Sequence, residues 1–221
     1  MDAMRIALIG ASGFVGSRLL AEALQRGHHV TALVRHPEKI ETQQHLKVLK
    51  SDVLNVDELA KQLAGHDVIV SAFNPARQSL DADIYERHIA GHRAIIAAVK
   101  KSGVRRFLAV GGAASLKTAA GIEFLDSPEF PSDYEPYKPS IRGTRALYYL
   151  LKEEPELDWV FLAPSVRTTP GARTGSYRVG KDHVLFDAQG TSHISLEDYA
   201  VAMLDELEKP KHHRERFTVG Y

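Results

Sequence analysis

Short apolar runs alternate with amphipathic stretches along most of the chain. The runs that read as strands cover residues 6–9, 29–34, 46–49, 67–72, 106–110 and 159–162. Between them, apolar residues recur at helical spacing, which predicts helices over about residues 14–24, 56–63, 82–101, 139–153 and 197–208. Strands that alternate with helices are typical of parallel pairing through right-handed crossovers. The pattern therefore predicts an α/β fold with a doubly wound parallel sheet.

The last part of the chain is less regular. Short extended pieces at residues 184–186 and 217–219 flank the last predicted helix. We expect the stretch from roughly 165 to 221 to fold back as a small cap on the substrate side of the sheet. Arg173 and Tyr177 fall in a loop of this stretch, where they either contact substrate or cover the sheet edge.

A glycine-rich turn joins the first predicted strand to the first predicted helix. It reads Gly10-Ala11-Ser12-Gly13-Phe14-Val15-Gly16. In this position Gly10 permits a sharp exit from the strand, Gly13 lets the backbone approach a pyrophosphate, and Gly16 lets the helix press against the sheet. The N–H groups of the first helical turn face the anion, and Ser12 offers it a hydroxyl. We expect this turn to bind a dinucleotide; the alternative is a tight turn that binds nothing.

The end of the second strand predicts which dinucleotide is preferred. Sites for NAD usually place a carboxylate there, to accept a hydrogen bond from the ribose 2′-hydroxyl. This strand ends without one and continues into Arg35, whose planar guanidinium suits a 2′-phosphate. The sequence thus favours NADP(H), with NAD(H) as the alternative, unless Arg35 is only a solvated loop residue.

Two further segments follow the carboxyl ends of predicted strands. Asp52 and Val53 come after the third strand, and Ala72, Phe73 and Asn74 come at the end of the fourth. Ligands of open parallel sheets bind at these ends. We expect Asp52 to accept a hydrogen bond from the adenine amino group, with Val53 and Phe73 packed near the adenosine. The alternative is that all of them are ordinary loop residues.

Composition narrows the function further. The 28 Lys and Arg residues balance 28 Asp and Glu, and zero net charge argues against a nucleic-acid-binding protein. The absence of cysteine excludes disulfides, thiolate zinc sites, iron–sulfur clusters and cysteine nucleophiles. No apolar stretch is long enough for a membrane span, and the first apolar run leads into the glycine turn and not into a signal peptide. We therefore expect a cytoplasmic protein.

Two other hypotheses follow from the residue counts. Eleven histidines raise the question of a metal site, but His88 and His92 share a helix face without an evident third ligand, so we expect no metal. With 221 residues and about 150 residues in a typical domain, a single domain over 1–221 is favoured. No internal repeat or Gly/Ser linker marks a boundary.

These motifs together resemble the atypical branch of the short-chain dehydrogenase/reductase superfamily. The resemblance is carried by residues 10–16, 110–116, 157–164, 171–177 and 194–200. The chain is similar to NAD-dependent epimerase/dehydratase-like and NADH-flavin reductase-like proteins, and to the NmrA-like and biliverdin-IXβ-reductase-like groups. The resemblance implies that Gly111 belongs to the cofactor site, that Pro164 borders the nicotinamide, and that Ser115 lies beside the nicotinamide and substrate.

Superfamily members that oxidise alcohols or epimerise sugars use a Tyr-x-x-x-Lys pair on one helix, where the lysine lowers the pKa of the tyrosine. Tyr134 and Lys138 match this spacing. Pro136 lies between them and Pro139 follows, which disfavours a regular helix through both partners. We therefore consider Tyr134, Tyr137 and Lys138 as catalytic candidates beside Ser115, and favour a pocket-lining role for Tyr137 or Lys138. This departure counts against an epimerase or dehydratase.

The sequence predicts an NAD(P)H-dependent oxidoreductase, with NADPH favoured, that transfers hydride to a small conjugated acceptor such as a flavin or quinone. One alternative is an NmrA-like regulator that senses the dinucleotide without turnover. Another is a nucleotide-sugar epimerase or dehydratase. We expect a small-molecule substrate, neither nucleic acid nor membrane as a partner, and a monomer or homodimer.

Overall fold

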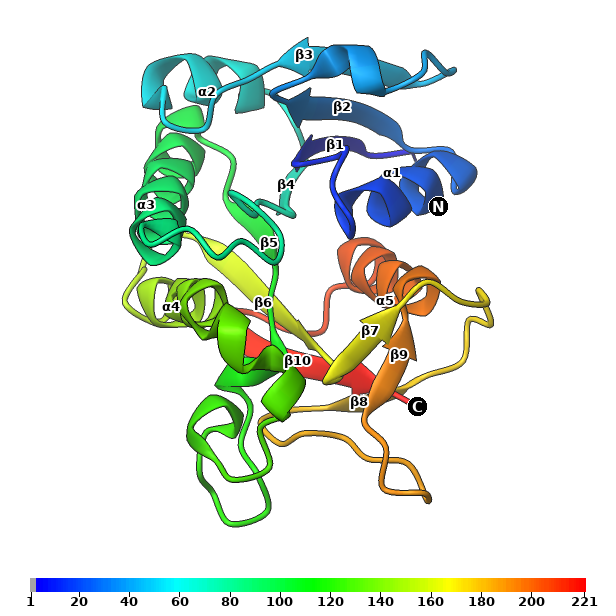
Figure 1. Ribbon diagram of the computed structural model, residues 1–221. Helices are drawn as coiled ribbons and strands as arrows, with labels where there is room; N and C mark the ends of the chain where they lie inside the picture. Colours follow the sequence, from blue (N-terminus) through cyan, green and yellow to red (C-terminus); the bar gives the residue numbers. More distant parts are fainter. Residues whose placement is uncertain (1–2) are drawn as a thin grey trace.

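A computed structural model describes residues 3–221, in which an eight-stranded sheet lies between two layers of helices (Figure 1). The order of its strands is β3-β2-β1-β4-β5-β6-β10-β8. All neighbours pair in parallel except β10 and β8, and a separate parallel pair is formed by β7 and β9. The predicted doubly wound parallel sheet is confirmed.

The strands have the following bounds: β1 Arg5–Ile9, β2 His29–Val34, β3 Leu46–Lys50, β4 Val68–Ser71, β5 Arg106–Val110, β6 Asp158–Pro164, β7 Arg167–Thr169, β8 Arg178–Gly180, β9 His193–Ser195 and β10 Glu215–Gly220. The α-helices are α1 Gly16–Gln25, α2 Val56–Leu63, α3 Ile84–Ser102, α4 Lys138–Lys152 and α5 Leu196–Glu208. Four 3₁₀-helices, η1 to η4, cover Pro37–Lys39, Ala113–Ser115, Phe124–Asp126 and Ser132–Tyr137.

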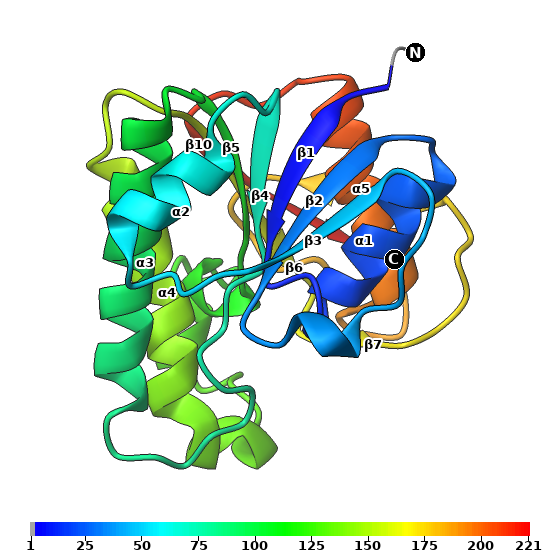
Figure 2. The ribbon, with the colours of Figure 1, turned by 90° about the horizontal axis from the view of Figure 1, so that it is seen from above.

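The central strands are apolar on both faces because both faces are covered. Helices α2, α3 and α4 cover one face, and α1 and α5 cover the other (Figures 1 and 2). Along β1, Ile6 and Leu8 pack toward α1 and α5, whereas Ala7 and Ile9 pack toward α2, α3 and α4. A continuous apolar run therefore supplies side chains to two cores. Each large side chain that is buried contributes about 1.5–3 kcal/mol to the free energy of unfolding.

The end of the chain folds differently from the prediction. Residues 215–220 form β10, which pairs in parallel with β6 inside the main sheet and does not fold back as part of a cap. Without β10, the apolar β6 would be an edge strand with unpaired backbone groups. β10 covers this edge, and its Phe217 and Val219 are buried in the core. The expected extended piece at 184–186 forms no strand, and β8 pairs with β10 in its place.

The loop before β8 is held against the α1 and α5 side. Arg173 binds the buried carboxylate of Glu22 through Nε at 2.7 Å and Nη2 at 2.8 Å, and the Tyr177 hydroxyl donates to Asp205 at 2.6 Å. Neither side chain lines the cleft described below. Arg173 and Tyr177 thus bind α1 and α5, and the role of covering the sheet edge stays a prediction.

Asp198, at the start of α5, anchors the same loop. Its buried carboxylate accepts hydrogen bonds from the N–H groups of Thr174 and Gly175, at 2.8 and 2.7 Å, and from the hydroxyls of Thr174 and Tyr221, at 2.5 and 2.6 Å. Burial alone would raise the pKa of Asp198, but these hydrogen bonds bring it below its ordinary value. The ionised carboxylate is therefore the form that stabilises the fold.

We predict that Asp198→Asn destabilises the protein by about 2–3 kcal/mol at pH 7, because an amide cannot accept all four hydrogen bonds. The folded-state pKa is depressed, so this contribution is present above the unfolded value of about 3.9 and is lost as the pH falls through the folded value. Urea unfolding should show a constant deficit from about pH 5 to 8 that shrinks below about pH 4. Asp57→Asn, which changes an exposed carboxylate on α2, is the control. A wild-type midpoint for Asp198→Asn would contradict this account.

Candidate dinucleotide and substrate site

The turn between β1 and α1 is closed so tightly that it requires glycine. Gly10 has φ of +80°, and a Cβ there would lie 2.7 Å from the carbonyl oxygen of Ala72. A Cβ at Gly16 would lie 2.1 Å from the carbonyl oxygen of Gly10, and the Gly13 N–H donates to that same oxygen at 3.0 Å. Any side chain at Gly10 or Gly16 would force the turn open, so the geometry requires glycine at these two positions.

The N-terminus of α1 offers unpaired donors to an anion. Its capping residue, Val15, supplies no side-chain cap, and the first turn holds no acidic residue. Among the described residues, neither the Phe14 nor the Val15 N–H donates to a protein acceptor. Free N–H groups at the positive end of a helix suit a phosphate, so the turn fits the pyrophosphate of a dinucleotide.

A cavity of about 460 Å³ extends from this turn along the carboxyl ends of the strands, and we call it the nucleotide cavity. Most of the predicted cofactor residues line it: Gly10, Ser12, Gly13, Phe14, Val15, Arg35, Asp52, Val53, Ala72, Phe73, Asn74 and Gly111. Ala11 and Gly16 are buried behind the turn and shape it from within. Residues far apart in the chain therefore lie along one continuous surface.

The rim of this cavity near β2 is positively charged. Arg35 lies there with His36 and Lys39, and its Nη2 donates to the carbonyl oxygen of Pro75 at 3.4 Å. Of the described residues that line the nucleotide cavity, Asp52 alone has a carboxylate, and it follows β3 and not β2. The position that a ribose-binding carboxylate takes in NAD sites thus lacks one.

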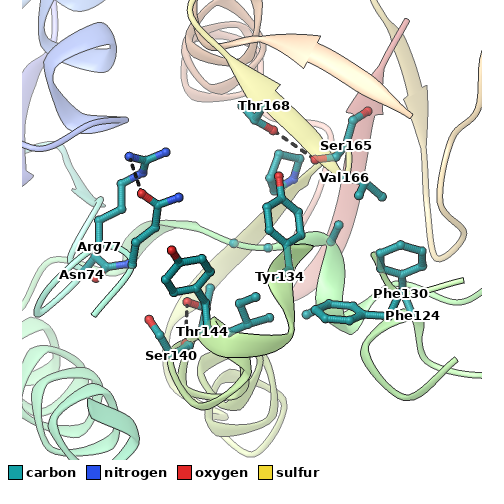
Figure 3. Close-up of a pocket in the computed structure, with 18 of the residues that line it drawn as sticks. Asn74, Arg77, Phe124, Phe130, Tyr134, Ser140, Thr144, Ser165, Val166 and Thr168 are labelled. Carbon is teal, nitrogen blue, oxygen red and sulfur yellow. Dashed lines mark hydrogen bonds between the residues drawn. The ribbon is translucent and has the colours of Figure 1, made fainter. Parts of the chain in front are cut away.

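A second cavity of about 270 Å³ adjoins the first, and we call it the substrate cavity (Figure 3). The two share Phe14, Asn74, Arg77, Gly111 and Thr144. The remaining wall is largely aromatic and apolar, with one amide and a few hydroxyls: Gln78, Gly112, Ala113, Ala114, Phe124, Phe130, Tyr134, Tyr137, Ser140, Ile141, Pro164, Ser165, Val166 and Thr168. Its size and composition suit a small ring system held beside the reacting end of a dinucleotide.

Ser115 does not line either cavity, contrary to its expected place beside the nicotinamide. It ends the 3₁₀-turn η2, is buried, and its hydroxyl donates to the carbonyl oxygen of Gly112 at 3.2 Å. The turn presents Ala113 and Ala114 to the substrate cavity instead. Pro164 lines the substrate cavity with Gly111; its place beside the nicotinamide stays a prediction.

The candidate pair Tyr134 and Lys138 is divided between two helices. Tyr134 lies in η4, whereas Lys138 begins α4, so the two prolines end one helix type and start the next. Lys138 Nζ binds Glu135 at 2.7 Å, and the Tyr134 hydroxyl accepts a 3.5 Å hydrogen bond from Arg167. Tyr134 and Tyr137 line the substrate cavity, and Lys138 does not. The structure therefore supports pocket-lining tyrosines more than an acid–base dyad.

Two residues of the cleft, Arg77 and Ser140, were not predicted from the sequence. Arg77 lies in the loop before α3, lines both cavities and places its guanidinium 3.8 Å from the ring centre of Phe14. Ser140, on α4, reaches the substrate cavity. The position of Arg77 depends on the conformation of its loop, which the sequence pattern does not predict. Ser140 could have been found, because Ser140 and Thr144 are four residues apart and so share one face of a helix.

Between residues 3 and 221, no helix is long and apolar enough to cross a membrane. The same range contains no cluster of three or more His, Cys, Asp or Glu side chains that could hold a metal ion.

The chain matches the family model described as NAD(P)H-binding over residues 10–210. It is 41% identical over 221 residues to the uncharacterized protein YwnB of Bacillus subtilis (strain 168), covering 98% of each chain. A solved structure from Bacteroides thetaiotaomicron, called a "putative epimerase", is 52% identical with a TM-score of 0.91, over 100% of this chain and 98% of that one. Another, from Streptococcus pneumoniae and called a "putative NADH-flavin reductase", is 31% identical with a TM-score of 0.85, over 99% of each chain. The glycine turn, the cleft at the strand ends and these matches agree that the chain belongs to the NAD(P)H-binding family.

Proposed function

We propose that the protein is an oxidoreductase that uses NADPH to reduce a small conjugated acceptor such as a flavin or quinone. The observation that carries the proposal is the contact between the two cavities at Gly111 and Phe14, which lets a ring in the apolar cavity meet the reacting end of a dinucleotide. The likeness to the S. pneumoniae protein called an NADH-flavin reductase supports the same class of reaction.

The residues of the nucleotide cavity have separate tasks in this proposal. The turn from Gly10 to Gly16 holds the pyrophosphate, Arg35 with its basic neighbours holds the 2′-phosphate, and Asp52 accepts from the adenine amino group. Arg77, at the junction of the cavities, adds positive charge beside the pyrophosphate. When bound, the dinucleotide supplies the hydride, while the protein supplies position and electrostatics.

An epimerase is the second candidate, because the relative that is 52% identical is called a "putative epimerase". That chemistry would need a general base near the sugar. Tyr134 is the residue with the matching motif, but Lys138, its expected partner, is bound to Glu135. The apolar wall around Phe124 and Phe130 also suits a conjugated ring better than a polyhydroxylated sugar.

The preference for NADPH is tested at Arg35. We predict that Arg35→Ala weakens NADPH binding about tenfold or more, because a hydrogen bond between charged groups contributes about 1.5–3 kcal/mol, and leaves NADH binding nearly unchanged. Calorimetric titration of both dinucleotides measures the difference. Arg93→Ala removes the same charge from an exposed position on α3 and should leave both affinities unchanged. Equal affinities for NADPH and NADH in the wild-type protein would contradict the assignment.

The reaction is tested by following NADPH absorbance with a panel of flavins and quinones. We predict oxidation of NADPH with at least one acceptor of these two classes, and no turnover of nucleotide sugars. Tight NADPH binding without oxidation by any acceptor would favour a sensing role instead. Turnover of a nucleotide sugar that Tyr134→Phe abolishes, in a protein that purifies with oxidised NAD, would favour the epimerase.

A further inference from the structure

A line of buried polar side chains leads from the interior to the wall of the substrate cavity. His88 and His92 lie on α3 and are almost fully buried. The rings meet with His88 Nδ1 3.4 Å from His92 Nε2, and His88 Nε2 lies 3.1 Å from the hydroxyl oxygen of Ser140 on α4. Ser140 is the member of this line that reaches the cavity (Figure 3).

The packing of α3 on α4 fixes the position of His88. A Cβ added at Gly143 would lie 2.5 Å from His88 Cβ, so the ring occupies space that only glycine leaves open on α4. His92 lies beside Phe73, with ring centres 5.4 Å apart in an edge-to-face arrangement. Both rings are therefore held in fixed orientations by neighbours that also line or support the cleft.

Both histidines are neutral near pH 7. Burial, with a smaller effect from the charge of Arg87, lowers the pKa of His88 to about 4. Burial, with a smaller effect from His88, lowers the pKa of His92 to about 3. Each ring therefore has one N–H donor and one acceptor nitrogen, and the hydrogen bonds decide which nitrogen is which.

The unpaired nitrogen of His92 decides which way the hydrogen bonds run along this line of side chains. His92 Nδ1 is buried and has no hydrogen-bond partner. Orphaned buried N–H groups are rarer than unpaired acceptors, so Nδ1 is the acceptor and Nε2 carries the proton. His92 then donates to His88 Nδ1, and His88 must donate from Nε2 to the oxygen of Ser140. This leaves the hydroxyl hydrogen of Ser140 free to point into the cavity.

We propose that Ser140 donates a hydrogen bond to the carbonyl oxygen of a conjugated acceptor, and that His88 and His92 are positioning residues that orient its hydroxyl. This inference rests on the proposed reductase function and narrows the acceptor to conjugated carbonyl compounds, quinones in particular. With NADPH bound, the acceptor would take a hydride from it and leave NADP⁺. The electron pair displaced in the acceptor would move to its oxygen, and a proton from water would complete the reduction. The Ser140 hydroxyl stabilises the charge that develops on that oxygen.

Activity with menadione tests the donor. We expect Ser140→Ala to lower kcat about 100-fold, the usual loss for one donor to a developing oxyanion, without a change in the Kd for NADPH. Ser102→Ala, which removes a hydroxyl at the far end of α3, should keep wild-type activity. Full activity in Ser140→Ala would overturn this inference alone. A wild-type protein that oxidises no NADPH with any acceptor would overturn the proposed function and this inference with it.

Variants of His88 test whether it acts through Ser140. His88→Phe should lower kcat, and His88→Gln, whose amide can still donate, should recover most of the loss. The double variant His88→Phe with Ser140→Ala should have the same kcat as Ser140→Ala alone. If His88→Phe instead damaged the structure independently of Ser140, the two losses in kcat would multiply. A multiplied loss in the double variant would refute the positioning role.

The tautomers are tested without any ligand. Nitrogen-detected NMR of the histidine rings in the free protein should show neutral rings with the proton on Nε2 in both His88 and His92. A proton on Nδ1 of either ring would contradict the proposed direction of the hydrogen bonds from His92 through His88 to Ser140 and overturn the inference. This measurement also covers the case in which His88→Phe fails to fold.

Discussion

The contact of Gly16 with the carbonyl group of Gly10 is the constraint on which the rest of the site depends. Because no side chain separates them, α1 begins directly over the end of β1 and directs its free N–H groups at the sheet edge. Gly10 in turn lies against the backbone of Ala72, so the same turn fixes where the chain leaves β4. The loop that carries Phe73 to Arg77 therefore starts from a defined point, and the nucleotide cavity lies between these two exits.

The other half of the cleft depends on the end of the chain. By adding β10 beside β6, the chain keeps β6 inside the sheet, and the anchors at Asp198 and Glu22 hold the loop of residues 171–177 on the α1 and α5 side. Only a short segment from Pro164 to Thr168 is left to border the substrate cavity. The rest of the expected cap lies elsewhere: β8 and β10 extend the sheet, and α5 covers one of its faces.

The features predicted correctly are those that neighbouring residues encode. The bounds of β2 and β5 and of α2 were predicted to the residue. The tight turn between β1 and α1 was predicted from its glycines alone. The features missed depend on long-range packing. An apolar run at 217–219 suits a cap or a strand of the sheet equally, and what distinguishes them is the pairing of this run with β6. Likewise the turn of η2 directs Ser115 inward, and the contact of His88 with Ser140 joins residues 52 positions apart.

The two cavities differ in charge, and Arg77 lies where they meet. The nucleotide cavity must neutralise phosphates, so it places Arg35 and Arg77 at solvent-facing positions where a charge costs little. In an apolar wall an unpaired ammonium would carry a large desolvation cost; the Lys138 ammonium, 5.0 Å from the ring centre of Phe130, is paired with Glu135. A neutral histidine pair avoids this cost, because it orders donors and acceptors without adding charge to the wall. Apart from Arg77 at the junction, the described residues that line the substrate cavity are uncharged. Neutral donors suit an uncharged carbonyl better than a sugar phosphate, which is why the chemistry of the wall agrees with a quinone-like acceptor.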